Sequence, residues 1–373
     1  MIKIFYIIFF IYFLLLLKIF FNKKRIDIKN LPLLSFFLFS LICIFFNTSY
    51  HFELGWDGFS WKEKTNFFYN GGYLFDINKF TDTYQNYPHL GTYIWAFFWK
   101  NSLLNYEYFG RLFYDYIFIV SIFSIIQNFR NISDTKKIFI FIFIFFCIFD
   151  NGLGGYQDFL IFSILTIFAA ILVNHYFNKN NYLFYLVYLL SGVLLPWIKT
   201  EGFVYSLFLL IIFFIYEFEF NKNKKNYLKY LFSILIIFSL IIRVFTNNFI
   251  LDENTLFQSN LTNFIKSDLT LNFFLSKVYY ILFYTINSFF KYPIWLFNFF
   301  ALLLSLYFLK DIKILKIFMI FLILNFLFIF VIYITSSVNI IWHLSASLDR
   351  LLLQTSGFYF VIFSLLNKKV IKF

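Results

Sequence analysis

Long apolar runs alternate with short polar connections along almost the whole chain. Many runs approach the roughly 20 residues that a helix needs to cross the hydrocarbon core of a bilayer. Apolar residues are continuous within each run rather than alternating with polar ones, which favours helices over a membrane β-barrel. The pattern predicts spans at 4–21, 32–50, 109–129, 138–150, 158–177, 182–198, 203–217, 228–245, 292–309, 314–334 and 350–366. We therefore predict an all-α polytopic membrane protein of about 11 transmembrane helices, with residues 1–373 forming one integral membrane domain.

Three regions affect the span count. Lys291 and Pro293 interrupt 278–309, so this region is either an interfacial helix followed by one span or two short spans. Residues 90–99 are too short to span and predict a helix lying in the membrane interface. The first apolar run, 4–21, is too long for a signal peptide and lacks a small-residue cleavage site, so we interpret it as a span.

The composition agrees with this class. The 373 residues are 61% hydrophobic and 27% aromatic, with a mean hydropathy of +0.77. The abundance of Phe, Ile, Lys, Asn and Tyr suggests an AT-rich coding genome, so a single aromatic residue inside a span carries little functional weight. Cys43 and Cys147 both lie in apolar runs and are predicted to be core residues rather than a disulfide or metal pair.

The net charge of +12 does not indicate nucleic-acid binding, because most cations lie in short tracts beside the spans. That is the pattern of membrane topology signals. If the basic connections are cytoplasmic, the N-terminus lies outside and the C-terminus inside. The connections 51–108, 150–158, 199–202, 246–277 and 335–349 then all lie outside. Most carboxylates fall in these outer connections, although only the cations were used to assign the sides.

The loop 51–108 carries the richest polar segment, and 246–277 is the second large outer loop. If residues 53–57 are helical, the i, i+4 spacing places Glu53 and Asp57 on one face. Partial desolvation beside Trp56 and Trp61 raises a carboxyl pKa toward that of a general base. The structural alternative is a solvated acidic loop with interfacial Trp anchors.

Four further groups of polar residues lie at the same predicted face, and each also has a structural explanation. Asp158 begins a span, where a carboxylate caps a helix favourably, and Pro88 fixes a turn between its two neighbours. Arg350 lies at the predicted outer face, against the usual bias of cations toward the cytoplasm, and binding of a phosphate group would explain this position. The candidate residues are Tyr87, His89, Asp158, Lys199, Glu201, His343, Asp349 and Arg350. The sequence contains no Walker A loop, dinucleotide GxGxxG, HExxH or CxxC motif.

In order, these motifs are a WDGFSW acid loop, a Tyr-Pro turn, a GYQD at a span start, a KTEG hairpin and a late SLDRLL. The chain resembles bacterial members of the GT-C superfamily of membrane glycosyltransferases over roughly residues 50–360, as scattered short motifs. The resemblance implies that Asp57 is the essential acid of the first outer loop and Asp158 the acid of the second. Many members have a second acid beside the first, where this chain has Gly58.

The expected function is therefore transfer of a sugar from a polyprenyl-phosphate donor to a lipid, glycan or protein acceptor. The enzyme would be an inverting hexosyl- or pentosyltransferase at the outer face of the bacterial cytoplasmic membrane. Asp57, with Glu53 and Asp158, would supply catalytic carboxylates, and Asp57 and Asp158 are the candidates to hold a divalent metal, which is the one cofactor considered. Arg350, Lys199 and His343 would hold the donor phosphate, and Glu201 and Asp349 would line the substrate site.

Tyr87 and His89 would shape the acceptor side, while Trp56, Trp61 and Lys62 would contact substrate. One alternative with the same chemistry is an O-antigen or capsule-type polysaccharide polymerase. An alternative of a different class is a flippase or transporter of lipid-linked sugars. That class predicts charged or broken helices near mid-membrane, whereas these spans are largely free of charge, with Asp115 and Arg243 as partial exceptions.

Overall fold

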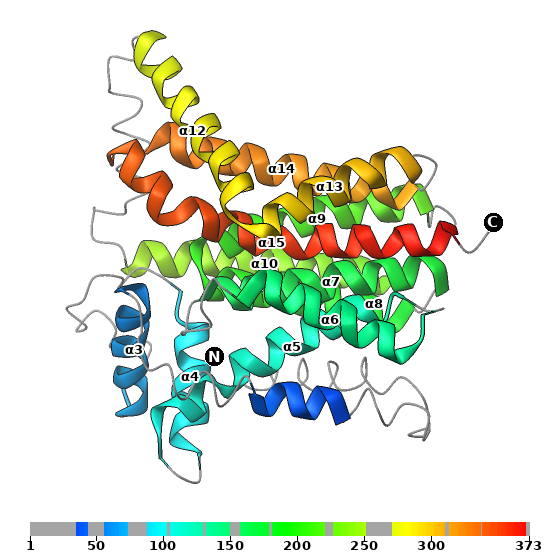
Figure 1. Ribbon diagram of the computed structural model, residues 1–373. Helices are drawn as coiled ribbons and strands as arrows, with labels where there is room; N and C mark the ends of the chain where they lie inside the picture. Colours follow the sequence, from blue (N-terminus) through cyan, green and yellow to red (C-terminus); the bar gives the residue numbers. More distant parts are fainter. Residues whose placement is uncertain are drawn as a thin grey trace.

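The computed structural model describes residues 35–43, 56–73, 88–102, 105–129, 132–149, 157–178, 181–220, 227–250, 271–309, 313–336 and 338–370. Within these ranges the regular elements are helices, and no β-strand occurs (Figure 1). The labelled elements are α3 (Trp56–Tyr69), α4 (Leu90–Lys100), η3 (Glu107–Arg111), α5 (Leu112–Ile126), α6 (Asp134–Phe149), α7 (Gln157–Asn178), α8 (Asn181–Ile198), α9 (Thr200–Phe220), α10 (Tyr227–Ile250), α12 (Leu271–Lys291), α13 (Pro293–Phe308), α14 (Lys313–Thr335) and α15 (Ile340–Val370). The all-α prediction is confirmed for this part of the chain.

Five helical segments in the described ranges are long and apolar enough to cross a membrane. They are Glu107–Ile126, Gln157–Asn178, Thr200–Glu219, Lys229–Thr246 and Lys313–Thr335. The bent pair formed by α12 and α13 makes six if it is one span. The chain is therefore compatible with a multi-pass membrane protein, whereas the count of about 11 stays a prediction. The predicted span at 4–21 lies outside the described residues, and only 35–43 of the one at 32–50 is described.

Helix α7 lies at the centre of the bundle, packed against α5, α8 and α15 (Figure 1). Its apolar window is 89% buried, whereas that of α10 is 33% buried. Helix α10 keeps large apolar side chains exposed, such as Ile234 and Phe238, which suits contact with lipid hydrocarbon. Cys147 is buried as predicted, but Cys43 is exposed, because its segment lies at the edge of the described bundle.

The predicted interruption of 278–309 is a sharp bend between α12 and α13, whose axes differ by 98°. Pro293 is the first residue of α13, and Tyr292 before it is extended at φ −116° and ψ 129°. Proline disfavours the helical conformation for the preceding residue and removes a backbone donor. Helix α12 is consequently steeply inclined to α13, and its first residues project beyond the bundle in Figure 1, while the helix still packs against α14 and α15.

Helices α3 and α4 pack on one another and bring the first polar segment against the bundle. The prediction of a helix at 90–99 is confirmed by α4. The rings of Phe68 and Tyr93 meet edge to face at 5.0 Å between centroids. Trp95 Nε1 donates to the backbone oxygen of Glu107 at 3.4 Å, which ties α4 to η3. Since α4 also contacts α8, the α3–α4 pair is fixed at the end of the bundle where α8 finishes.

Candidate active site

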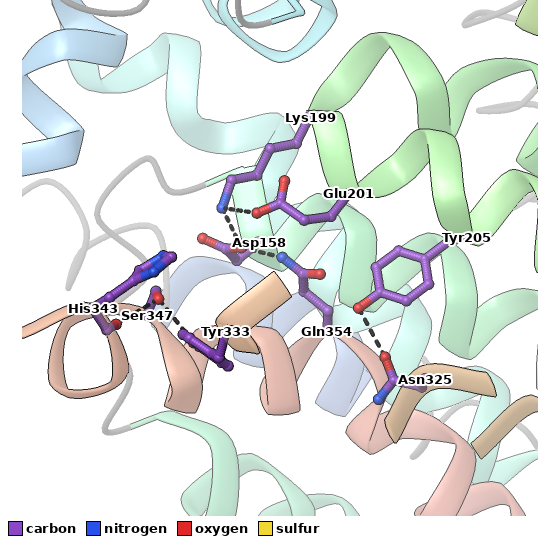
Figure 2. Close-up of polar contacts among 9 residues, drawn as sticks. All are labelled: Asp158, Lys199, Glu201, Tyr205, Asn325, Tyr333, His343, Ser347 and Gln354. Atoms are coloured by element: carbon purple, nitrogen blue, oxygen red, sulfur yellow. Dashed lines mark hydrogen bonds and ion pairs between the residues drawn. The ribbon is translucent and has the colours of Figure 1, made fainter. Parts of the chain in front are cut away.

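A buried ionic cluster lies where α7 begins and where α8, α9 and α15 meet it (Figure 2). Lys199 Nζ donates to Asp158 Oδ1 at 2.9 Å and lies 3.2 Å from Glu201 Oε1. Gln354 Nε2 on α15 donates to the same Asp158 oxygen. Three predicted residues from two connections, Asp158 from one and Lys199 and Glu201 from the other, are thus brought together with a fourth from α15. We call these four residues the Asp158 cluster.

The backbone explains why these side chains meet. Asp158 lies in the first turn of α7, where the helix dipole favours a negative charge. Lys199 is the single residue between the last residue of α8 and the first of α9. Glycine at 202 permits this tight turn, because a Cβ there would collide with the backbone oxygen of Leu195. The KTEG segment therefore forms a compact hairpin that holds Lys199 and Glu201 beside Asp158.

Burial makes this cluster costly unless its charges are paired. The side chains of Asp158 and Lys199 are 3% and 8% exposed, and that of Glu201 is 17% exposed. Pairing through Lys199 offsets part of the cost of removing the carboxylates from water. Glu201 Oε2 is buried and has no hydrogen-bond partner, and the same holds for Gln354 Oε1. Two acceptor atoms are thus available to a hydroxyl group that enters the cluster.

Polar contacts continue from the cluster along α14 and α15 (Figure 2). Tyr205 OH donates to Asn325 Oδ1 at 3.2 Å, and Asn325 Nδ2 donates to Thr355 Oγ1 at 2.9 Å. Tyr333 OH lies 2.8 Å from Ser347 Oγ. These bonds tie α9, α14 and α15 together within a largely apolar bundle, where each unpaired polar group would be costly.

The three candidate residues on α15 lie at its N-terminal part. His343 Nδ1 is 2.8 Å from Ser336 Oγ, and burial lowers the pKa of His343 below its usual value of 6.5. Asp349 Oδ1 is buried and has no hydrogen-bond partner. Arg350 is half-buried one helical turn before Gln354, so α15 brings a guanidinium toward the Asp158 cluster.

The candidates of the first polar segment are only partly described. Trp61 is 3% exposed and His89 8% exposed, while Lys62 is half-buried. Positions 56 and 57 form the first turn of α3, but the side chains of Trp56 and Asp57 are outside the description, as are Glu53 and Tyr87 altogether. The burial of Trp61 means that its ring is part of the packing between α3 and its neighbours.

One member of the cluster, Gln354, and two other buried polar residues, Lys64 and Arg243, were not among the predicted site residues. Gln354 had no distinguishing pattern beyond lying one turn after Arg350 on the same helix. Lys64 is 0% exposed on α3, although its charged surroundings in the sequence are typical of a solvated helix. Arg243 is 5% exposed near the end of α10, and its position inside an apolar run is the sequence signal that could have identified it.

No group of three or more His, Cys, Asp or Glu side chains suited to a metal ion occurs among the described residues. The suggestion that Asp57 and Asp158 share a metal remains a prediction, since the side chain of Asp57 is not described. Comparison of the chain with protein-family models, with curated proteins and with solved structures gave no match.

Proposed function

We propose that the chain is a membrane glycosyltransferase that moves a sugar from a polyprenyl-phosphate donor to an acceptor hydroxyl. The site would face the outside of a bacterial cytoplasmic membrane. The observation that carries the proposal is the Asp158 cluster, in which two carboxylates and an ammonium from three helix ends are buried at one end of an apolar bundle. Ionisable groups are costly in such a place and are generally kept for function.

The arrangement suits a transfer in which the bond between the anomeric carbon and the phosphate oxygen breaks while the acceptor oxygen bonds to that carbon. The acceptor proton would pass to Asp57, and the electron pair would leave with the polyprenyl phosphate. Arg350 and His343 on α15 would hold this phosphate and stabilise its developing charge. Lys199 would complete that set while keeping Asp158 and Glu201 in place.

Helix α3 supports a role for Asp57. Position 57 lies two helical turns before Lys64, and Lys64 is fully buried where α3 meets the bundle. The helix that carries Asp57 is therefore packed rather than solvated along the face that Lys64 occupies. A general base carried by a packed helix would be partly desolvated, which suits proton uptake.

A polysaccharide polymerase would use the same donor and the same residues, and it differs only in the length of the acceptor. A flippase of lipid-linked sugars is the alternative of another class. Candidate residues of the Asp158 cluster gather at the ends of α7, α8 and α9 rather than at their centres, which favours the enzyme over a carrier with a mid-membrane site.

The test is to incubate the purified full chain with a panel of polyprenyl-phosphate sugars and a mixed glycolipid acceptor extract, and to measure release of polyprenyl phosphate. Wild-type protein should release the carrier from at least one donor. Asp158→Asn should not, whereas Asp134→Asn on α6 should behave as wild type, since Asp134 is only in a partly exposed pair with Lys137. A wild-type protein that moves intact lipid-linked sugar across vesicles without releasing carrier would replace the proposal by the flippase.

A further inference from the structure

A second group of buried basic residues comes from α3, from the residue before α4 and from α10, rather than from α15. The first member is Lys64 on α3, which is 0% exposed. Its Nζ lies 5.4 Å from the centroid of the Trp61 ring. Phe68, one turn later on the same face of α3, packs its ring 6.0 Å from the His89 ring. The Lys64 face of α3 is thus turned toward the start of α4.

The second member is Arg243 on α10, which is 5% exposed. Arg243 Nε donates to the backbone oxygen of Pro196 at 3.1 Å, and the guanidinium lies 5.8 Å from the centroid of the Trp197 ring. Pro196 and Trp197 form the last turn of α8, directly before Lys199. The guanidinium is therefore anchored beside the hairpin that supplies the Asp158 cluster.

The third member is His89, which precedes the first residue of α4. It is 8% exposed, and its Nδ1 is buried with no hydrogen-bond partner. Burial and the nearby charges of Lys64 and Arg243 hold the pKa of His89 well below its usual value. A buried imidazole nitrogen beside two cationic side chains lacks the polar partner that buried nitrogens ordinarily have.

Lys64, His89 and Arg243 come from different elements around the Asp158 cluster than Arg350 does. Glycine at 91, two residues after His89, lies directly on the side chain of Gln157, which is the residue before Asp158. Arg350, in contrast, lies on α15 one turn from Gln354, which bonds to Asp158 from that helix. Since Arg350 and His343 on α15 are assigned to the donor phosphate, the separate basic group of Lys64, His89 and Arg243 suits an anionic group on the second substrate, the acceptor.

We propose that Lys64, His89 and Arg243 form a binding site for a phosphate group carried by the acceptor, so that the acceptor is a phosphorylated lipid or glycolipid. The identification of the bound molecule as the acceptor rests on the proposed function, whereas the phosphate site itself does not. Arg243 supplies a planar fork that suits two phosphate oxygens, and Lys64 supplies a point charge. The His89 ring adds a donor once it is protonated beside the bound anion.

The site is tested first by binding. The full chain in neutral detergent is dialysed to equilibrium against radiolabelled inorganic phosphate. Saturable binding is expected for the wild type, weakened roughly tenfold to hundredfold in Lys64→Met, the loss typical of one charged hydrogen-bond donor. Lys64→Met removes the charge and keeps an apolar stem of similar length, and thermal unfolding checks that the variant folds. Lys100→Met on exposed α4 surface is the control and should bind as wild type.

The acceptor assignment is tested by competition in the carrier-release assay. Inorganic phosphate should inhibit competitively with the acceptor and not with the donor, and Lys64→Met should raise the KM for the acceptor alone. No saturable phosphate binding, or binding that Lys64→Met leaves unchanged, would overturn the site. Competition with the donor instead would overturn the acceptor assignment and leave the proposed function standing. A wild-type protein that binds phosphate but releases no carrier would contradict the proposed function and support the phosphate site.

Discussion

Lys199 Nζ lies 2.9 Å from Asp158 Oδ1, although 41 residues separate them in the chain. Removing one partner of a buried ion pair leaves the other charge uncompensated, which typically costs about 3–5 kcal/mol. We therefore expect Lys199→Met to lower the free energy of unfolding by that order, measured by denaturant titration in micelles. The double variant Asp158→Asn, Lys199→Met should lose clearly less than the sum of the two single losses. Additive losses would show that the two side chains do not interact.

Asp57→Asn should abolish transfer while the protein remains folded and inserted. Loss of a general base typically lowers the rate by about 100-fold or more, and the amide keeps nearly the same shape. Glu63→Gln is the matched control, because Glu63 is exposed on the same helix and should retain full activity. An active Asp57→Asn protein would remove Asp57 from the mechanism.

Gly202→Ala should disrupt the Asp158 cluster without touching a charged residue. The added Cβ would collide with the backbone oxygen of Leu195, and such overpacking commonly costs about 1–3 kcal/mol. Transfer activity and the melting temperature should both fall. Thr200→Ala in the same turn is exposed and should leave both unchanged. If Gly202→Ala melts and reacts as wild type, the tight α8–α9 turn is not needed to hold the cluster.

The membrane topology predicts that Ser60 and Ser345 face the same side of the membrane. After Cys43 and Cys147 are replaced, single cysteines at these positions should react with an impermeant maleimide added outside intact cells. A cysteine at Asn178, the exposed last residue of α7, should react only after permeabilisation. Labelling of Ser60 without Ser345, or the reverse, contradicts the assignment of a shared outer face.

Anion binding beside Lys64 should weaken as the pH rises. Burial and the charge of Arg243 lower the pKa of Lys64 to about 7, so its ammonium is lost as the pH passes that value. The charge of Arg243 persists, and the depressed pKa of His89 keeps that ring neutral above pH 7. Sulfate, whose own charge is constant from about pH 6 to 9, should therefore bind more weakly at pH 9 than at pH 6. Lys64→Arg should flatten this profile, because arginine stays protonated, and an unchanged slope would exclude Lys64 as its source.

Sequence reasoning found the residues whose surroundings are unusual along the chain. Asp158, Lys199 and Glu201 are charges next to long apolar runs, and the positive-inside pattern placed their connections on one side before any contact was known. The helix positions were predictable as well, because the length of an apolar run indicates whether it can span a membrane. The bend at Pro293 was also readable, because proline acts locally on the residue before it.

Residues that become buried only through tertiary packing were not predictable. Lys64 lies in a segment rich in charged residues, and only the docking of α3 against its neighbours removes it from water. Gln354 lies in a mixed stretch of α15 and gains its role from meeting Asp158 across a separation of 196 residues. No local pattern carries information about such distant partners.

The one-residue connection at Lys199 has a mechanical consequence. With α8 ending at Ile198 and α9 starting at Thr200, the two helices have no loop in which to hinge. A change in their mutual angle would drag the ammonium away from both carboxylates at once. The positions of the charges in the Asp158 cluster are thus set before any ligand binds, as preorganised electrostatics require. In the proposed transferase, an opening that admits a lipid-borne sugar would then come from the elements packed around this hairpin, the α3–α4 pair or α12.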